Sequence, residues 1–149
     1  MYEKHLSAIQ KSYLAGFLDG DGSIYVRLKP NPTYRYGFQV APYIVLFQSA
    51  QDRKNFEQIC SLIGLGYLRL RKDGVLEYTI AKKEAIITFL DMVRPYSVLK
   101  KVQIKLMTRI LKEKDKVKNE RDFQKLMILI DSFRNLNYSK KRKLRTLTP

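Results

Sequence analysis

The chain has 149 residues, of which 45% are hydrophobic and 29% are charged. This composition excludes a disordered or collagen-like polymer and predicts one folded domain over residues 1–149. One cysteine (Cys60) excludes an intramolecular disulfide, and one histidine (His5) excludes a Cys/His zinc cage. No run of about 18 apolar residues and no signal peptide are recognisable, so we expect an intracellular protein that is neither secreted nor bound to a membrane.

Charge gives the first positive indication of function. The 29 lysines and arginines outnumber the 14 acidic residues, and the resulting net charge of +15 predicts a polyanionic partner. The excess lies in two regions, residues 100–149 and the acid-free residues 22–51. In the second region basic residues and tyrosines share strand-like segments, which favours nucleic acid over a lipid surface.

Periodicity in the first half predicts a helix followed by two strands. The helix runs from a capping box at Ser7 to about Asp19, where glycines stop it. Alternating apolar and polar residues then predict strands over 23–29 and 34–48, joined by a proline-containing turn. Because Pro42 lies inside the second strand, we expect an edge position or a bulge there.

The second half repeats the order helix, strand, strand. A helical pattern around 56–63 ends at Gly64, and the hairpin signature Asp73-Gly74 separates two further strands. Those strands are expected over 66–72 and 75–81, and three helices after them over 83–93, 97–113 and 120–136.

Together these elements predict an α+β fold with an αββαββα core and C-terminal helices. The core covers about residues 7–113, and a helical extension with a basic tail covers about residues 114–149. The two pairs of strands are expected to form a twisted antiparallel sheet, whose polar and basic face binds nucleic acid.

Residues 13–23 break the ordinary rules for a helix. Ala15 and Gly16 interrupt a run of bulky apolar residues, and such small residues would let a second helix approach closely. Asp19 and Asp21 lie near the end of the helix, where its dipole disfavours carboxylates by about 0.3–1 kcal/mol each. A bound cation would reverse that penalty, and exposed carbonyl oxygens at this end suit Mg²⁺. An Asp/Gly turn without metal is the alternative.

This segment, with the core Leu-Ala-Gly-Phe-Leu-Asp-Gly-Asp-Gly, closely resembles the signature of the LAGLIDADG homing endonucleases. The resemblance covers about residues 7–145, and its single copy of the motif is similar to the homodimeric, intron-encoded class. It implies a metal-dependent double-strand break in a long, nearly palindromic DNA target. We expect the lone motif helix to expose apolar side chains that a second subunit covers. The implied dimer interface comprises Leu14, Ala15, Gly16, Phe17 and Leu18.

The resemblance also implies the active site. Asp21 matches the acid that binds the metal, and Gly20 matches the residue whose carbonyl faces it. The implied ion is Mg²⁺, with Mn²⁺ as a substitute and Ca²⁺ supporting binding without cleavage. Gln48 and Lys100 match polar residues that organise the catalytic water, with Lys100 stabilising charge on the phosphorane. Without the resemblance, Lys100 would be one of many surface lysines and Gln48 a strand-end amide.

One position departs from the family's pattern. Close relatives carry a basic residue four positions after the glutamine, where this chain has Asp52. Either Arg53 substitutes as a catalytic residue from the next position, or a charge-stabilising contact is missing and cleavage is slower.

Base reading is expected on the strand faces opposite the apolar ones, because a twisted antiparallel ribbon fits the major groove. For any single residue, an ordinary solvated sheet face is the alternative. A strand of about ten residues spans roughly 33 Å, so a dimer would contact double-stranded DNA over about 20 base pairs. The candidates are Tyr25, Arg27, Lys29, Asn31, Tyr34, Arg35, Gln39, Tyr43, Arg69, Arg71, Glu77 and Thr79, with Ser139, Lys140, Lys141 and Lys143 of the basic tail on the backbone.

A second function class stays open at this stage. A protein of the same fold could bind nucleic acid without cutting it, as an intron RNA maturase or as an inactive DNA binder, and RNA would then be a partner. The presence of Asp21, Gln48 and Lys100 favours the enzyme. Cys60 is expected in the core and His5 at an exposed terminus, neither of them catalytic.

Overall fold

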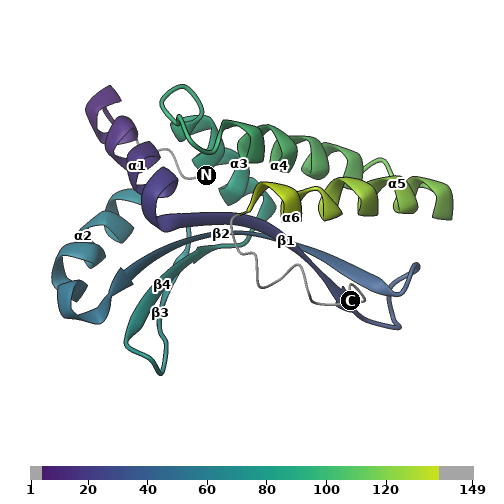
Figure 1. Cartoon of the computed structure of the whole chain (residues 1–149), viewed down its shortest axis with the longest axis horizontal. Helices are drawn as coiled ribbons and strands as arrows, with labels where there is room; N and C mark the ends of the chain where they lie inside the picture. Colours follow the sequence, from purple (N-terminus) through teal and green to yellow (C-terminus); the bar gives the residue numbers. More distant parts are fainter. Residues whose placement is uncertain (1–4, 138–149) are drawn as a thin grey trace. The chain divides into compact units, whose positions relative to one another are not determined.

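The computed structural model describes residues 5–137, and they follow the predicted αββαββα order with further helices after it (Figure 1). Four strands form one sheet in the order β1-β2-β4-β3, in which β4 pairs antiparallel with both β2 and β3. The predicted α+β fold is therefore confirmed. The strands are β1 (Gly22–Pro30), β2 (Phe38–Ser49), β3 (Tyr67–Leu70) and β4 (Val75–Ile80). The helices are α1 (Ala8–Asp21), the short 3-10 helix η1 (Ala50–Asp52), α2 (Arg53–Ile63), α3 (Lys83–Val93), α4 (Lys101–Lys114), α5 (Glu120–Asp131) and α6 (Phe133–Leu136).

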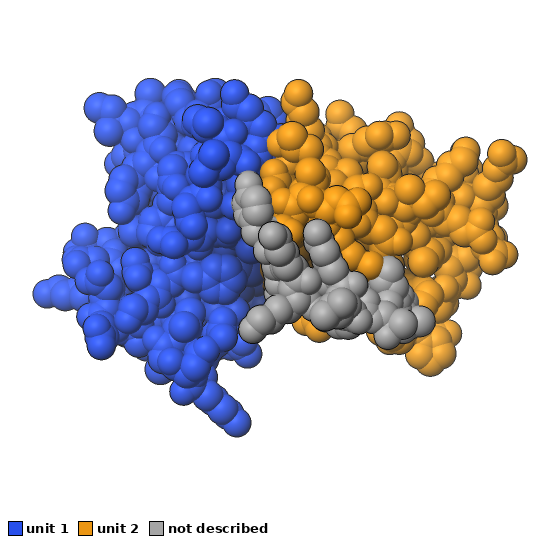
Figure 2. Space-filling model, viewed as in Figure 1, with its two compact units in different colours: residues 1–23, 44–101 blue, residues 24–43, 102–149 orange. Residues whose placement is uncertain are grey.

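The chain divides into two compact units, which Figure 2 colours separately. Within the described residues, unit 1 comprises 5–23 and 44–101, and unit 2 comprises 24–43 and 102–137. That the chain forms one domain over residues 1–149 stays a prediction. No helix in the described part of the chain is long and apolar enough to span a membrane.

Unit 1 is built around α1, α3 and the strands beneath them. The capping box begins α1 as predicted, because Ser7 Oγ accepts a hydrogen bond from the Gln10 amide at 3.1 Å and Gln10 Oε1 accepts one from the Ser7 amide at 3.0 Å. Helices α1 and α3 contact one another, and the Phe17 ring stacks on Phe56 of α2 at 5.8 Å between centroids. The fully buried side chains of this unit include Leu14, Leu18, Leu46, Leu76 and Phe89.

Unit 2 combines most of β1 and the first half of β2 with the C-terminal helices, which lie along one side of these strands in Figure 1. Its core includes Ile24 of β1, Val40 of β2 and Met107 of α4. Two hydrogen bonds link its segments. Gln103 Nε2 of α4 donates to the Leu136 carbonyl of α6 at 3.2 Å, and Asn137 Nδ2 donates to the Ile24 carbonyl of β1 at 3.4 Å.

Two predicted boundaries in the first half are wrong. Helix α1 continues to Asp21 instead of ending at about Asp19, and Gly22 caps it because its backbone amide donates a hydrogen bond to the Leu18 carbonyl. Strand β2 begins at Phe38 instead of 34, because the preceding residues form turns that close through Gly37, whose φ is 82°. Pro42 lies inside β2 but before the ladder with β4, which begins at Ile44, so it costs no hydrogen bond there.

In the second half the hairpin and α3 match the prediction, whereas the last two helices differ from it. Gly74 turns the hairpin with φ 84°, and Gly64 ends α2 in the left-handed region with φ 64°. Helix α4 begins at Lys101 instead of 97, because residues 97–100 form a separate turn. The helix predicted over 120–136 is divided at Ser132 into α5 and α6.

Two tyrosines form a matched pair for testing how this fold is stabilised. The buried Tyr78 hydroxyl accepts hydrogen bonds from the amides of Leu65 and Gly66, at 2.8 and 2.7 Å. The buried hydroxyl of Tyr36 has no hydrogen-bond partner among the described residues. We expect Tyr78→Phe to destabilise the protein by about 1–3 kcal/mol, because two backbone donors lose their acceptor. We expect Tyr36→Phe to leave stability unchanged or raise it.

Urea unfolding of the two variants checks this pair. Equal losses of stability in both would contradict the assignment of the two hydroxyls.

Candidate functional site

The C-terminal turn of α1 presents the motif acid Asp21. Gly20 and Asp21 are both exposed, and no hydrogen bond or ion pair among the described residues engages the Asp21 carboxylate. Carbonyls in the last turn of a helix lack intrahelical partners, so Gly20 can offer its oxygen beside the carboxylate. A Cβ added at Gly22 would lie 2.8 Å from the Leu18 carbonyl oxygen, which explains the glycine after Asp21.

These oxygen ligands suit a hard cation that needs few protein groups. In the described residues no cluster of three or more His, Cys, Asp or Glu side chains could hold a metal ion. Mg²⁺ does not need such a cluster, because it is commonly held by one or two carboxylates together with substrate phosphates and waters. Asp21 with the Gly20 carbonyl fits Mg²⁺ in that manner.

The other motif acid, Asp19, has a structural position that the sequence did not indicate. Its carboxylate accepts hydrogen bonds from Ser97 Oγ at 2.5 Å and from the amides of Val98 and Leu99 at 2.8 and 3.0 Å. Burial of this carboxyl acts to raise its pKa, but the hydrogen bonds from Ser97 and the three following amides outweigh burial and lower the pKa of Asp19. Asp19 is therefore an ionised anchor for the turn at 97–100.

Lys100 lies on this turn and reaches the motif helix. Its Nζ donates to the main-chain carbonyl oxygen of Asp19 at 3.3 Å. The structure thus brings Lys100 to the last turn of α1, the turn that carries Asp21, although the two positions are far apart in sequence.

Gln48 lies near the end of β2, opposite Leu76 of β4. It shares a strand face with the buried Leu46, so it points to the side of β2 that holds the core of unit 1. Its Oε1 accepts a hydrogen bond from the Ser49 amide at 2.8 Å, while its Nε2 has no hydrogen-bond partner among the described residues. Gln48 therefore keeps a donor available for a ligand.

Arg53 begins α2 and is paired within that helix. Its Nε lies 3.4 Å from Glu57 Oε2, and both side chains are about half exposed. The neighbouring Asp52 accepts a hydrogen bond from Asn55 Nδ2 at 3.2 Å. The pairing with Glu57 directs the Arg53 guanidinium along α2. The catalytic role of Arg53 stays a prediction.

The predicted exposure of the motif helix is wrong for three of its residues. Leu14, Ala15 and Leu18 have no exposed surface, because α1 packs against α3 of the same chain, and Phe17 is half-buried against α2. They belong to the core of unit 1 and are not available to a second copy. Gly16 is exposed as expected.

A different stripe of α1 is exposed. Ile9, Tyr13, Gly16 and Gly20 recur at helical spacing on the side opposite the buried leucines, and a Cβ at either glycine would meet no atom within 4 Å. The stripe is apolar at its start and lacks side chains toward Asp21. A second helix could therefore approach its backbone closely.

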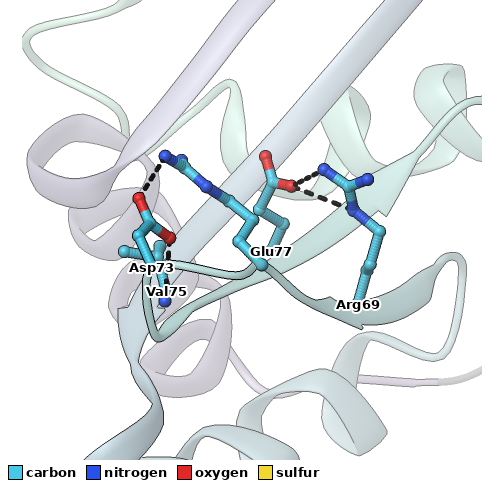
Figure 3. Close-up of polar contacts among 5 residues, drawn as sticks. Arg69, Asp73, Val75 and Glu77 are labelled. Atoms are coloured by element: carbon cyan, nitrogen blue, oxygen red, sulfur yellow. Dashed lines mark hydrogen bonds and ion pairs between the residues drawn. The ribbon is translucent and has the colours of Figure 1, made fainter.

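The hairpin of unit 1 carries two paired arginines (Figure 3). Arg69 lies directly opposite Glu77 in the β3–β4 ladder and donates to Glu77 Oε1 from Nη2 at 2.6 Å and from Nε at 3.2 Å. Arg71 donates from Nη2 to Asp73 Oδ2 at 2.6 Å. Thr79 lies two residues beyond Glu77 on the same strand face. Both arginines are thus ion-paired, Arg69 on the edge strand β3 and Arg71 directly after it.

Unit 2 carries an aromatic and basic strand face. The Tyr25 and Tyr43 rings lie 5.4 Å apart, and Lys29 Nζ lies 5.4 Å from the centroid of Tyr43. Arg27 is exposed between Tyr25 and Lys29 on β1. This arrangement matches the predicted polar face of the sheet.

The remaining residues predicted to contact nucleic acid do not all lie on a strand face. Asn31 Oδ1 accepts hydrogen bonds from the Thr33 amide at 3.0 Å and from Thr33 Oγ1 at 2.6 Å, so it shapes the β1–β2 turn. Tyr34 and Arg35 are exposed on that turn, and Gln39 is half-buried at the start of β2. Ser139, Lys140, Lys141 and Lys143 lie outside the described residues.

Sequence reasoning missed the contact of Asp19 with Ser97. The hydrophobic pattern after Pro95 is typical of a helix from 97 onward, so nothing local marked Ser97 as a buried polar residue. Cys60 is a core residue as predicted, and burial raises the pKa of its thiol to about 11, so it stays protonated at neutral pH.

Comparisons with known proteins agree with this geometry. A family model described as LAGLIDADG endonuclease matches residues 14–111. The DNA endonuclease I-CreI of Chlamydomonas reinhardtii is 34% identical over 132 residues, covering 88% of this chain and 80% of that protein. The DNA endonuclease I-CvuI of Chlorella vulgaris is 30% identical over 131 residues, covering 88% of this chain and 81% of that protein.

Solved structures agree in fold. Two crystal structures of I-CvuI match with a TM-score of 0.83 and sequence identities of 30% and 29%, covering 90% of this chain and 85% of theirs. One holds the I-CreI target with 2 mM Mg and uncleaved DNA, and the other holds the I-CvuI target with 2 mM Ca.

Proposed function

Because the chain belongs to the LAGLIDADG endonuclease family, we propose that it is an intracellular homing endonuclease that cuts both strands of a long, nearly palindromic DNA site as a homodimer. The observation that carries the proposal is the end of α1. There the exposed carboxylate of Asp21, which has no partner within residues 5–137, stands on the helical turn to which Lys100 donates a hydrogen bond.

The active-site residues divide the chemistry among them. Asp21 and the Gly20 carbonyl would hold Mg²⁺, which when bound lowers the pKa of water and stabilises charge on phosphate oxygens. Lys100 supplies a fixed positive charge for the attacked phosphate, and Gln48 Nε2 supplies a donor that orients water. Mn²⁺ should replace Mg²⁺, and Ca²⁺ should support binding without cleavage.

A second copy is needed because one chain supplies one such site and a double-strand break needs two. The exposed stripe of Ile9, Tyr13, Gly16 and Gly20 is the surface through which two motif helices would meet, bringing both Asp21 carboxylates to the centre of the target. Val98 and Leu99, which are 69% and 66% exposed on the turn anchored to Asp19, offer further apolar surface near the end of α1.

DNA recognition is assigned to the strand faces. In unit 1, Arg69 of β3 and Arg71 directly after it offer donors for bases and phosphates. In unit 2, such donors come from Arg27 and Lys29 of β1. Their neighbours Tyr25 and Tyr43 present aromatic surface beside the cations. The net charge of +15 favours this polyanion as the partner.

The test uses a plasmid that carries the I-CreI target, because I-CvuI, a relative of this chain, has been crystallised on that target. A library with randomised half-sites accompanies it. We expect linear plasmid with Mg²⁺ or Mn²⁺ over a range of concentrations, intact plasmid with EDTA, and a gel shift without cutting in Ca²⁺. Selected sites should be nearly palindromic and about 20 base pairs long.

Two results would contradict the proposal. Tight binding of a selected site without cutting under any divalent metal would favour an inactive binder. Binding of structured RNA in preference to every DNA would favour a maturase.

Glu77 gives a prediction about specificity. Its carboxylate accepts two hydrogen bonds from Arg69, so Glu77→Gln should weaken the hold on the guanidinium and raise the net charge by one. We expect tighter binding to unrelated DNA and about tenfold less discrimination at the base pair that Arg69 contacts. Gel shifts in Ca²⁺ on target and scrambled DNA measure both effects.

Glu57→Gln is the control for this prediction. It removes the same charge from the Arg53–Glu57 pair, which lies within helix α2 and not on a strand. Loss of discrimination in both variants would show that net charge, and not the orientation of Arg69, sets specificity.

A further inference from the structure

Lys100 stands on a turn that apolar packing does not hold. Residues 97–100 lie between the end of α3 and the start of α4. The two apolar side chains that precede Lys100, Val98 and Leu99, are 69% and 66% exposed, so they contribute little to fixing the turn. Polar contacts to α1 must therefore set where the turn lies.

Those contacts converge on one side chain. Both carboxylate oxygens of Asp19 are used, Oδ1 by Ser97 Oγ at 2.5 Å and Oδ2 by the amides of Val98 and Leu99 at 2.8 and 3.0 Å. Ser97 is only 1% exposed, and its own amide donates to the Val93 carbonyl at 2.9 Å, which ties the turn to the end of α3.

The same residue also receives the lysine. Lys100 Nζ donates to the main-chain carbonyl of Asp19 at 3.3 Å, so the side chain of Asp19 holds the backbone of the turn while its carbonyl holds the ammonium group. A carboxylate that accepts several hydrogen bonds from donors is a strong and directional anchor.

We propose that Asp19 is a positioning residue, which fixes the turn at 97–100 on α1 and thereby holds Lys100 at the last turn of α1, the turn that carries Asp21. Asp19 touches neither DNA nor metal in this role. The two motif acids thus have separate duties, one as metal ligand and one as the anchor of the lysine. The inference rests on the proposed function for its effect on cleavage, but the position of Lys100 is measurable without DNA.

The expected effect is on rate and not on affinity. Asp19→Ala removes the acceptor of three donors, so Lys100 loses its fixed place, and a misplacement of about 1 Å costs about 10²-fold in rate. Asp19→Asn keeps one carbonyl oxygen for the two amides, so it should retain most of the rate. Ser97→Ala, which removes one of the three bonds, should fall between them.

Three measurements test the proposal on full-length protein. Mass spectrometry follows amine-reactive labelling of Lys100, with the adjacent exposed Lys101 as internal reference. Single-turnover cleavage in Mg²⁺ and gel shifts in Ca²⁺ give rate and affinity. A double-mutant cycle compares Asp19→Ala in wild type with Asp19→Ala in Lys100→Ala. Sedimentation and thermal unfolding verify that each variant is folded and assembled as the wild type is.

We expect faster labelling of Lys100 in Asp19→Ala, a cleavage rate about 10²-fold lower at unchanged affinity, and almost no further loss when Lys100 is already alanine. Unchanged labelling of Lys100 in folded Asp19→Ala would overturn the proposal, and so would two losses of rate that simply add. If the wild type cuts no DNA, the proposed function fails, and the labelling result alone still decides whether Asp19 positions Lys100.

Discussion

Replacing Asp21 by asparagine should abolish DNA cleavage while leaving folding and target binding almost intact. The carboxylate is exposed and has no partner among the described residues, so its charge serves no structural contact there. Asparagine keeps the shape but is a far weaker ligand for Mg²⁺. Since metal contributes several kcal/mol to the transition state, the rate should fall by at least about 10³-fold.

Folding should not suffer from this change, and binding can become tighter. The substitution removes a negative charge from the C-terminal turn of a helix, where the dipole disfavours it by about 0.3–1 kcal/mol. In the proposed complex it also removes a negative charge that would repel DNA phosphate when no metal is bound. The measurement is plasmid cleavage in Mg²⁺ and in EDTA, beside a gel shift of the target in Ca²⁺.

Asp91→Asn is the matched control for Asp21→Asn. Asp91 is an exposed carboxylate of α3 paired with Arg94, and removing its charge should leave cleavage at the wild-type rate. If Asp21→Asn cuts DNA nearly as fast as this control, the assignment of Asp21 as metal ligand is wrong.

Local signals in the sequence were sufficient for most of the fold. The hairpin at Asp73-Gly74 and the end of α2 at Gly64 were predicted because each depends on a glycine with positive φ, at 84° and 64°, within a few residues of the element it ends. The capping box at Ser7 is likewise complete within four positions of the chain. Such features need no knowledge of the tertiary structure.

Contacts between distant residues were not predictable in the same way. Asp19 and Ser97 are 78 positions apart, and their hydrogen bond depends on how α1 and α3 pack. The sequence around Ser97 favours a helix, and only burial of its hydroxyl against Asp19 shows why α4 begins at Lys101. The motif located Asp19, but nothing in the motif distinguishes its duty from that of Asp21.

The orientation of α1 was ambiguous for a related reason. Apolar residues occur on both sides of the helix, with Leu14 and Leu18 on one and Ile9 and Tyr13 on the other. Periodicity identifies a helix but does not say which apolar side faces its own chain, and the side with Leu14 and Leu18 is the buried one. The surface left for a second copy is consequently the one that carries Gly16.

Two substitutions at neighbouring positions of α1 should therefore have opposite consequences. Ala15 has no exposed surface, so Ala15→Leu forces a larger side chain into a packed core, which costs about 1–3 kcal/mol of stability. A Cβ at Gly16 meets nothing within 4 Å, and leucine favours a helix over glycine, so Gly16→Leu should fold at least as stably as the wild type.

For dimerisation, in contrast, we expect Gly16→Leu to be the damaging substitution. If two α1 helices meet along the exposed stripe, the leucine side chain of Gly16→Leu stands where the second backbone must approach, and the protein should sediment as a folded monomer that no longer makes double-strand breaks. Sedimentation velocity at micromolar concentration with thermal unfolding measures both properties. Gln58→Leu, which adds a leucine at an exposed position of α2, should stay dimeric and active. A stable dimer of Gly16→Leu with wild-type cleavage would exclude this stripe as the interface.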